Sequence, residues 1–112
     1  MTTEEREQYN KLSELDREEY DLIKKKHPNW SHSQIITKLG VSVEIGKRLE
    51  KGEDVNPDDP TVIEEILKGA KKFLKRCGII IKEVFEAIDE VLTDVGNKLK
   101  DFWDWLWDYK VY

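Results

Sequence analysis

The apolar residues between Pro60 and Tyr109 follow a helical pattern. Apolar positions recur every three or four residues, so one stripe keeps its phase along a single helical face. A stripe of this length must be buried against the rest of the chain, against itself or against another molecule. The pattern therefore predicts an all-α protein. The stripe comprises Ile63, Ile66, Leu67, Ala70, Phe73, Leu74, Cys77, Ile81, Val84, Phe85, Ile88, Val91, Leu92, Val95, Leu99, Phe102, Trp103, Leu106 and Tyr109.

Gly78 is the favoured break in this run, with Gly96 and Asn97 as a second candidate. An unbroken helix of about fifty residues would extend about 75 Å, whereas a compact domain of this size has a radius of gyration of about 13 Å. Basic side chains precede Gly78 and acidic ones follow it, so a fold-back would bring opposite charges together. The apolar run of residues 79–81 is not a polar loop, so a continuous kinked helix is the alternative.

The first part of the chain carries helix start and stop signals. Residues 1–12 are polar, and we expect them to be flexible. Ser13 has a helix-capping pattern, and Pro28 disfavours a helix beyond His27. These signals predict a helix from about Ser13 to Lys26, whose C-terminal lysines complement the helix dipole.

Two shorter helices are predicted next. Ser31 and Gln34 form a capping box at the start of one helix, which Gly40 would end. Ser42 would cap another helix, which Gly52 would end. Two short helices joined by such a tight turn form a helix-turn-helix unit.

Length and composition favour a single small domain of four or five helices. The chain has 112 residues, of which 38% are charged and 38% hydrophobic, which is typical of a small helical protein with a strongly solvated surface. The predicted organisation is a flexible segment in residues 1–12, N-terminal helices with the helix-turn-helix unit in 13–52, a loop in 53–60, and a long amphipathic helix or helical hairpin in 61–112.

Neither catalysis nor a cofactor is indicated. His27, His32 and Cys77 lack the spacing of a metal site and the surrounding motif of a nucleophile and its base. We therefore expect no enzyme activity, metal, cofactor or small-molecule substrate. The polar, acidic start resembles no secretory leader, and the apolar run of residues 79–81 is too short to span a bilayer, so we expect a cytoplasmic protein.

The helix-turn-helix pattern resembles a known DNA-binding family. The segments that carry the resemblance are Leu39-Gly40-Val41-Ser42, Arg48-Leu49-Glu50-Lys51-Gly52 and Asn56-Pro57. They are similar to the turn, the end of the recognition helix and the following Asn-Pro of the Cro and lambda-repressor type. The resemblance covers residues 31–66 and implies a recognition helix that starts near Ser42 and Val43.

Charge gives mixed support to DNA binding. Residues 24–51 carry a net charge of +5, and Lys47, Arg48 and Lys51 would face outward towards phosphates, with Ile45 and Leu49 facing inward. However, Glu44 lies at the base-reading end of this helix, and the whole chain has a net charge of −5. A DNA-binding regulator that contacts DNA with these three residues, Ser42 and Val43, and dimerises through its C-terminal helices, is therefore the alternative hypothesis.

The C-terminus carries a cluster of aromatic residues. Residues 102–112 include three of the four tryptophans, and in a helix Trp105 and Tyr112 would project to one side of the stripe and Trp107 to the other. Large aromatic side chains beside aspartates are typical of interface hot spots. We therefore expect Trp105, Trp107, Tyr109 and Tyr112 to bind a protein partner or a second copy. The alternative is that this end packs on the domain's own core, while the acidic polar face disfavours a membrane surface.

Overall fold

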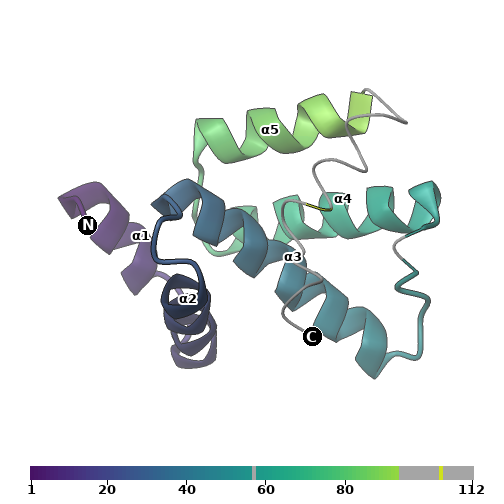
Figure 1. Ribbon diagram of the computed structural model, residues 1–112, viewed down its shortest axis with the longest axis horizontal. Helices are drawn as coiled ribbons and strands as arrows, with labels where there is room; N and C mark the ends of the chain where they lie inside the picture. Colours follow the sequence, from purple (N-terminus) through teal and green to yellow (C-terminus); the bar gives the residue numbers. More distant parts are fainter. Residues whose placement is uncertain (57, 94–103, 105–112) are drawn as a thin grey trace.

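The computed structural model describes residues 1–56, 58–93 and 104, and these residues form helices and connecting turns without strands. The helices are α1 (Thr3–Asn10), α2 (Glu14–Lys26), α3 (His32–Glu50), α4 (Pro60–Arg76) and α5 (Lys82–Thr93). Figure 1 shows α3 in the middle of the molecule, and its main contacts are with α2, α4 and α5. The predicted all-α class is confirmed for the described part of the chain.

The core forms where α3 meets its neighbours. Its N-terminal half provides Ile35, Ile36 and Leu39, which are fully buried. Burial of each such side chain stabilises the folded state by about 1.5–3 kcal/mol. Helix α3 is therefore the element against which the others pack. The further buried apolar side chains are Leu12, Tyr20, Ile23, Val41, Val62, Ile63, Ile66, Leu67, Ala70, Phe73, Leu74, Ile79, Val84, Ile88 and Val91.

Residues 1–12 differ from the flexible segment that we expected, because they contain α1. Thr2 and Glu5 form a capping box at its N-terminus. At its other end, the ring of Tyr9 packs edge-on against Tyr20 with 5.1 Å between the centroids. The helix itself has no buried residue and hence no clear amphipathic pattern. Its position depends on tertiary contacts that periodicity does not reveal.

The predicted helix from Ser13 to Lys26 is confirmed. Ser13 is the N-cap of α2, and its hydroxyl accepts a hydrogen bond from the amide of Asp16. The helix ends at Lys26, before His27 and Pro28. Three lysines in its last turn lie where the partial negative charge of the helix end favours cations.

The predicted turn at Gly40 is wrong, because α3 continues through it to Glu50. The capping box of Ser31 and Gln34 does start this helix. Gly40 lies at the crossing of α3 and α4: a Cβ there would lie 3.4 Å from the Cβ of Ala70 on α4, in close contact. The backbones of α3 and α4 therefore approach each other closely at this point. Gly52 does end the helix, with a φ of 71° that glycine adopts readily.

The predicted fold-back at Gly78 is confirmed. Gly78 has a φ of 76°, and the amide of Ile79 donates to the carbonyl of Leu74, which closes a Schellman motif at the end of α4. Ile79 is fully buried, which explains why the turn contains no polar loop. Lys11 also binds this turn, because its Nζ donates to the Gly78 carbonyl at 3.0 Å. Between the two helices, Lys71 pairs with Asp89, as the charge pattern predicts.

Candidate functional site

The predicted partner-binding residues Trp105, Trp107, Tyr109 and Tyr112 lie outside the described residues. The site that can be built from the structure is therefore the surface where the C-terminal half of α3 crosses α4. This surface also contains the residues that the DNA-binding hypothesis requires. It is described below from the α3 side, then from the α4 side.

The predicted DNA-contacting residues share one uninterrupted helix and its C-cap. Ser42 and Val43 lie inside α3 and are half-buried, and Val43 packs against the core. Lys47 lies over the ring of Phe73, with its Nζ 5.7 Å from the ring centroid. Lys51, the C-cap, is exposed. A continuous α3 therefore has no free helix start at Ser42 to insert into a DNA groove.

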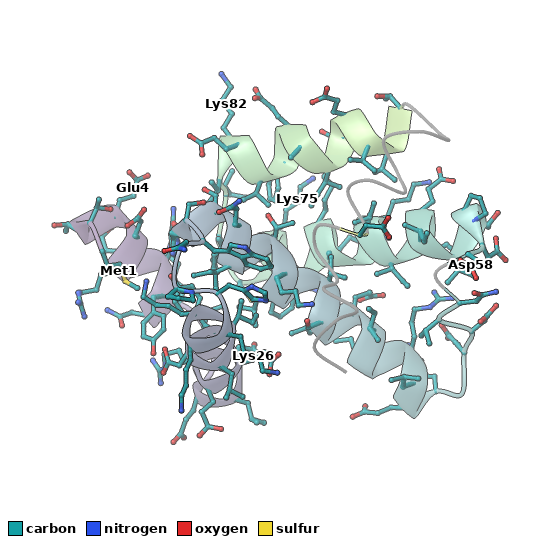
Figure 2. All side chains as sticks on the ribbon, in the orientation of Figure 1. Met1, Glu4, Lys26, Asp58, Lys75 and Lys82 are labelled. Carbon is teal, nitrogen blue, oxygen red and sulfur yellow. The ribbon has the colours of Figure 1, made fainter. Side chains whose placement is uncertain are left out.

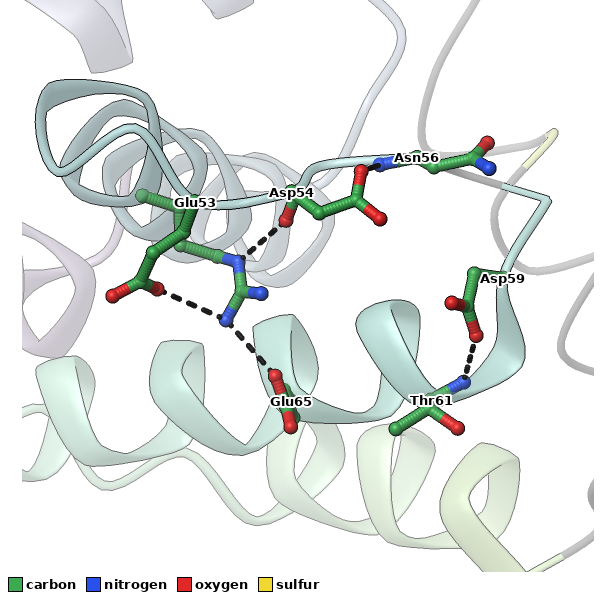
Figure 3. Close-up of polar contacts among 7 residues, drawn as sticks. Glu53, Asp54, Asn56, Asp59, Thr61 and Glu65 are labelled. Atoms are coloured by element: carbon green, nitrogen blue, oxygen red, sulfur yellow. Dashed lines mark hydrogen bonds and ion pairs between the residues drawn. The ribbon is translucent and has the colours of Figure 1, made fainter.

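Arg48 faces inward, contrary to our prediction, and its side chain is only 12% exposed. Its guanidinium joins the loop after α3 to helix α4: Nε donates to the Asp54 carbonyl at 3.0 Å, and Nη1 donates to Glu65 at 3.1 Å. Figure 3 labels the partners Glu53 and Asp54 in the loop and Glu65 on α4. The Glu53 carboxylate lies 3.5 Å from the same Nη1. Arg48 thus joins α3, the loop and α4. Leu49, predicted to be buried, is 59% exposed because the unbroken helix shifts its orientation.

Close crossing of α3 and α4 leaves an open groove of about 340 Å³ beside the contact. Its floor is Gly69 of α4, over which the side chain of Glu44 lies. A Cβ on Gly69 would come within 2.2 Å of that carboxyl group, so a larger residue there would make the flexible Glu44 side chain shift. Glu44 therefore places a half-buried carboxylate in the groove.

The α4 side of the groove is cationic. Lys68, Lys72 and Arg76 are exposed, recur every four residues and line the groove, so they lie along one side of the helix. Lys68 pairs with Glu64 at 3.3 Å, whereas Lys72 and Arg76 have no ion-pair partner among the described residues. Lys72 and Arg76 thus share the groove with the carboxylates of Glu44 and Glu65.

A polar cluster around His32 joins α1, α2 and α3. The Tyr20 hydroxyl lies 2.8 Å from His32 Nδ1, and His32 Nε2 lies 2.8 Å from Gln8 Oε1. Because an amide oxygen only accepts hydrogen bonds, Nε2 donates to Gln8 and Nδ1 accepts from Tyr20. Both ring nitrogens are therefore engaged, which leaves His32 without a free base for proton transfer.

Burial changes the pKa values in this cluster. It raises the pKa of Tyr20 to about 12, with smaller contributions from Glu5 and Asp21. Burial also lowers the pKa of His32, although the nearby Glu5 carboxylate opposes this shift. From the sequence, His32 is a candidate only for a metal ligand or a catalytic base; the cluster could not be predicted, because its partners come from other helices.

Three further findings bear on function. Among the described residues, no group of three or more His, Cys, Asp or Glu side chains is arranged to hold a metal ion. None of the described helices is long and apolar enough to cross a membrane. Comparisons with protein-family models, with curated proteins and with solved structures find no match to this chain. The resemblance to the Cro type therefore stays a prediction from sequence.

Proposed function

We propose that this protein is a non-enzymatic helical module that binds a protein partner, or a second copy of itself, through its C-terminal aromatic residues. The arrangement of His32 and Cys77 supports a role without catalysis. Both ring nitrogens of His32 are hydrogen-bonded, and burial raises the pKa of the Cys77 thiol, which disfavours the reactive thiolate.

The observation that carries the proposal is the register of α5. Its buried residues Val84, Ile88 and Val91 mark the direction of the core. A helix that kept this register would place Trp105 and Trp107 about 100° to either side of Ile88, at about 100° per residue. One core-facing stripe cannot contain both rings. Trp105 and Trp107 are therefore the best candidates for contact with another molecule.

Aromatic side chains at this position would suit an interface. Tryptophan and tyrosine bury a large area at a small cost in side-chain entropy, and they are enriched among the residues that dominate binding energy. Asp104 lies between Trp103 and Trp105, and Asp108 follows Trp107, which would keep such a surface hydrated before binding. The proposed interface thus combines apolar anchors with a polar rim.

The experiment compares Trp105→Ala with Trp103→Ala, which continues the core-facing stripe. Trp105→Ala should change the free energy of unfolding little but weaken association by about 2 kcal/mol or more. Trp103→Ala should reduce stability by about 3–5 kcal/mol. Chemical denaturation measures the first quantity, and light scattering with affinity capture measures the second. The proposal fails if Trp105→Ala destabilises the isolated monomer as much as Trp103→Ala does.

A further inference from the structure

Helix α1 is the most weakly anchored helix of the described region. None of its residues is buried, and the main contacts between helices do not involve it. Figure 1 shows it at the edge of the molecule, beside α2 and the start of α3. Isolated helices shorter than about 12 residues are marginal in water, and α1 has 8 residues. Helix α1 therefore depends on docking to stay folded, while the core begins only at Leu12, two residues beyond its end.

The last turn of α1 covers the polar cluster of Tyr20 and His32. Gln8 accepts a hydrogen bond from His32 Nε2 at 2.8 Å, and the Tyr9 ring lies edge-on against the ring of Tyr20. The Tyr20 hydroxyl donates to His32 Nδ1 at 2.8 Å, and Tyr20 is only 1% exposed. Departure of α1 would therefore uncover the sides of both groups that Gln8 and Tyr9 now contact.

We propose that protonation of His32 in mild acid releases α1 from α2 and α3, so that this cluster is a pH-sensitive switch for the docking of the first helix. The switch involves none of the C-terminal aromatic residues, so the inference goes beyond the function proposed above. Three observations support it: the hydrogen bonds of the cluster, the place of His32 at a helix start, and the weak anchoring of α1.

Protonation removes the acceptor that the Tyr20 hydroxyl uses. Nδ1 of the neutral imidazole accepts this hydrogen bond, but in the imidazolium both ring nitrogens carry a hydrogen and can only donate. Burial raises the pKa of Tyr20 to about 12, so the hydroxyl keeps its hydrogen and must turn it elsewhere. A buried donor that loses its acceptor destabilises the docked state. Water can accept this hydrogen bond once α1 has left.

The surroundings of His32 also disfavour its charged form. Burial lowers the pKa of His32 and outweighs the attraction of the Glu5 carboxylate on α1. His32 is also the first residue of α3, where the partial positive charge of the helix N-terminus repels a cation. Release of α1 would remove part of this burial, whereas α2 and α3 are held together by their buried apolar residues. Movement of α1 is thus the easiest way to hydrate the imidazolium.

Charged groups of both signs lie around His32. The helices packed against it and an open groove of about 460 Å³ beside it bring together carboxylates and cations. The described groups are Glu4, Glu5, Glu83, Lys24, Lys82 and the amino group of Met1. Figure 2 labels Glu4 on α1 and Lys82 at the start of α5, which both line the groove. The downward shift in the pKa of His32 means that this mixed charge does not compensate for burial.

The test follows the full chain by NMR from about pH 8 to about pH 5, the range in which histidine changes its charge. Backbone chemical shifts report the helix of α1, protection of its amides from hydrogen exchange reports its docking, and imidazole signals give the pKa of His32. His27→Gln is the matched control, because the chain has 2 histidines. His32→Gln removes the titrating ring but keeps an amide that donates and accepts. Gln8→Glu puts a carboxylate beside Nε2, which favours the imidazolium.

In the wild type, α1 should lose its helical shifts and its amide protection in acid, while α3 keeps both. The loss should begin near pH about 6.5 and level off below the measured pKa of His32, because the released helix leaves a ring that binds its proton first. Each unit by which that pKa lies below about 6.5 should give about a tenfold loss of α1 protection. His27→Gln should behave like the wild type, His32→Gln should lose the pH dependence, and Gln8→Glu should reverse it.

The proposal fails if α1 stays docked over the whole range, or if α1 and α3 lose protection together, because the chain then unfolds as a whole. It also fails if His32→Gln releases α1 in acid as the wild type does. If His32→Gln already frees α1 near pH about 8, Gln8→Glu decides, and release of α1 from that variant in acid refutes the switch. Association through Trp105 is measured separately, so failure of either proposal leaves the other standing.

Discussion

Replacing glycines of α3 with alanine tests whether this helix is continuous, the finding that separates the structure from a helix-turn-helix unit. Gly46 lies inside α3, and a Cβ there would meet nothing within 4 Å. Glycine in a helix interior is about 1 kcal/mol less favourable than alanine. Gly46→Ala should therefore raise the free energy of unfolding by about 1 kcal/mol and the melting temperature by about 4 °C.

Gly40→Ala is the more discriminating change. In the continuous helix, its Cβ would lie 3.4 Å from Ala70 Cβ and 3.6 Å from Leu74 Cδ1, which is tight but ordinary contact. The tight contact would partly offset the gain in helix propensity, so we expect Gly40→Ala to change the free energy of unfolding by between zero and about +1 kcal/mol. If Gly40 instead ended a helix in the left-handed conformation, alanine would cost about 1–2 kcal/mol.

Gly52→Ala provides the reference for that second case, because Gly52 has a φ of 71°. Gly52→Ala should lower the free energy of unfolding by about 1–2 kcal/mol, because alanine is strained at that φ. Urea denaturation followed by circular dichroism gives all three free energies of unfolding. The comparison is valid when the slope of the free energy against urea concentration is the same in the variants and the wild type. A loss for Gly40→Ala as large as that for Gly52→Ala would refute the continuous helix.

Three further predictions concern single side chains. Arg48→Met should lower the free energy of unfolding by about 1–2 kcal/mol, because it breaks charged hydrogen bonds to partly hydrated partners, whereas Lys51→Met should have almost no effect. Burial lowers the pKa of His32, so as pH falls the unfolded chain binds a proton at this residue before the folded chain does. The free energy of unfolding should therefore fall as pH drops below about 6.5. Loss of this pH dependence in His32→Phe would confirm that His32 is the responsible group. Cys77, whose pKa is raised by burial, should react with iodoacetamide more slowly than free cysteine, as mass spectrometry can follow.

Local signals in the sequence identified most helix ends correctly. Ser13 and Ser31 cap helices through hydrogen bonds to residues three positions later, so the residues that make each cap are close in sequence. Gly78 ended α4 as predicted, since a charge reversal and a glycine coincide there. Such features need no knowledge of the rest of the fold.

Gly40 shows why signals from neighbouring residues can predict a helix end wrongly. Gly40 has the sequence context of a helix end, with Val41 and Ser42 after it, yet it lies inside α3 and packs against Ala70 on another helix. The same limit applies to Arg48, whose partners include Glu65, and to α1, whose contacts come from α2 and α3. The candidate groove follows from these crossings, so it could not be predicted from periodicity or charge along the chain.

The hydrogen bond from Lys11 to the Gly78 carbonyl has a consequence for synthesis on the ribosome. Its two residues are 67 positions apart in sequence. At roughly 5–20 residues per second, translation takes about 3–13 s to proceed from one to the other. During that interval α1 is already made but lacks one of its anchors, as well as the contact of Gln8 with His32 until α3 follows. Helix α1 is synthesised before α2 to α5 and is nevertheless among the last of them to complete its native contacts.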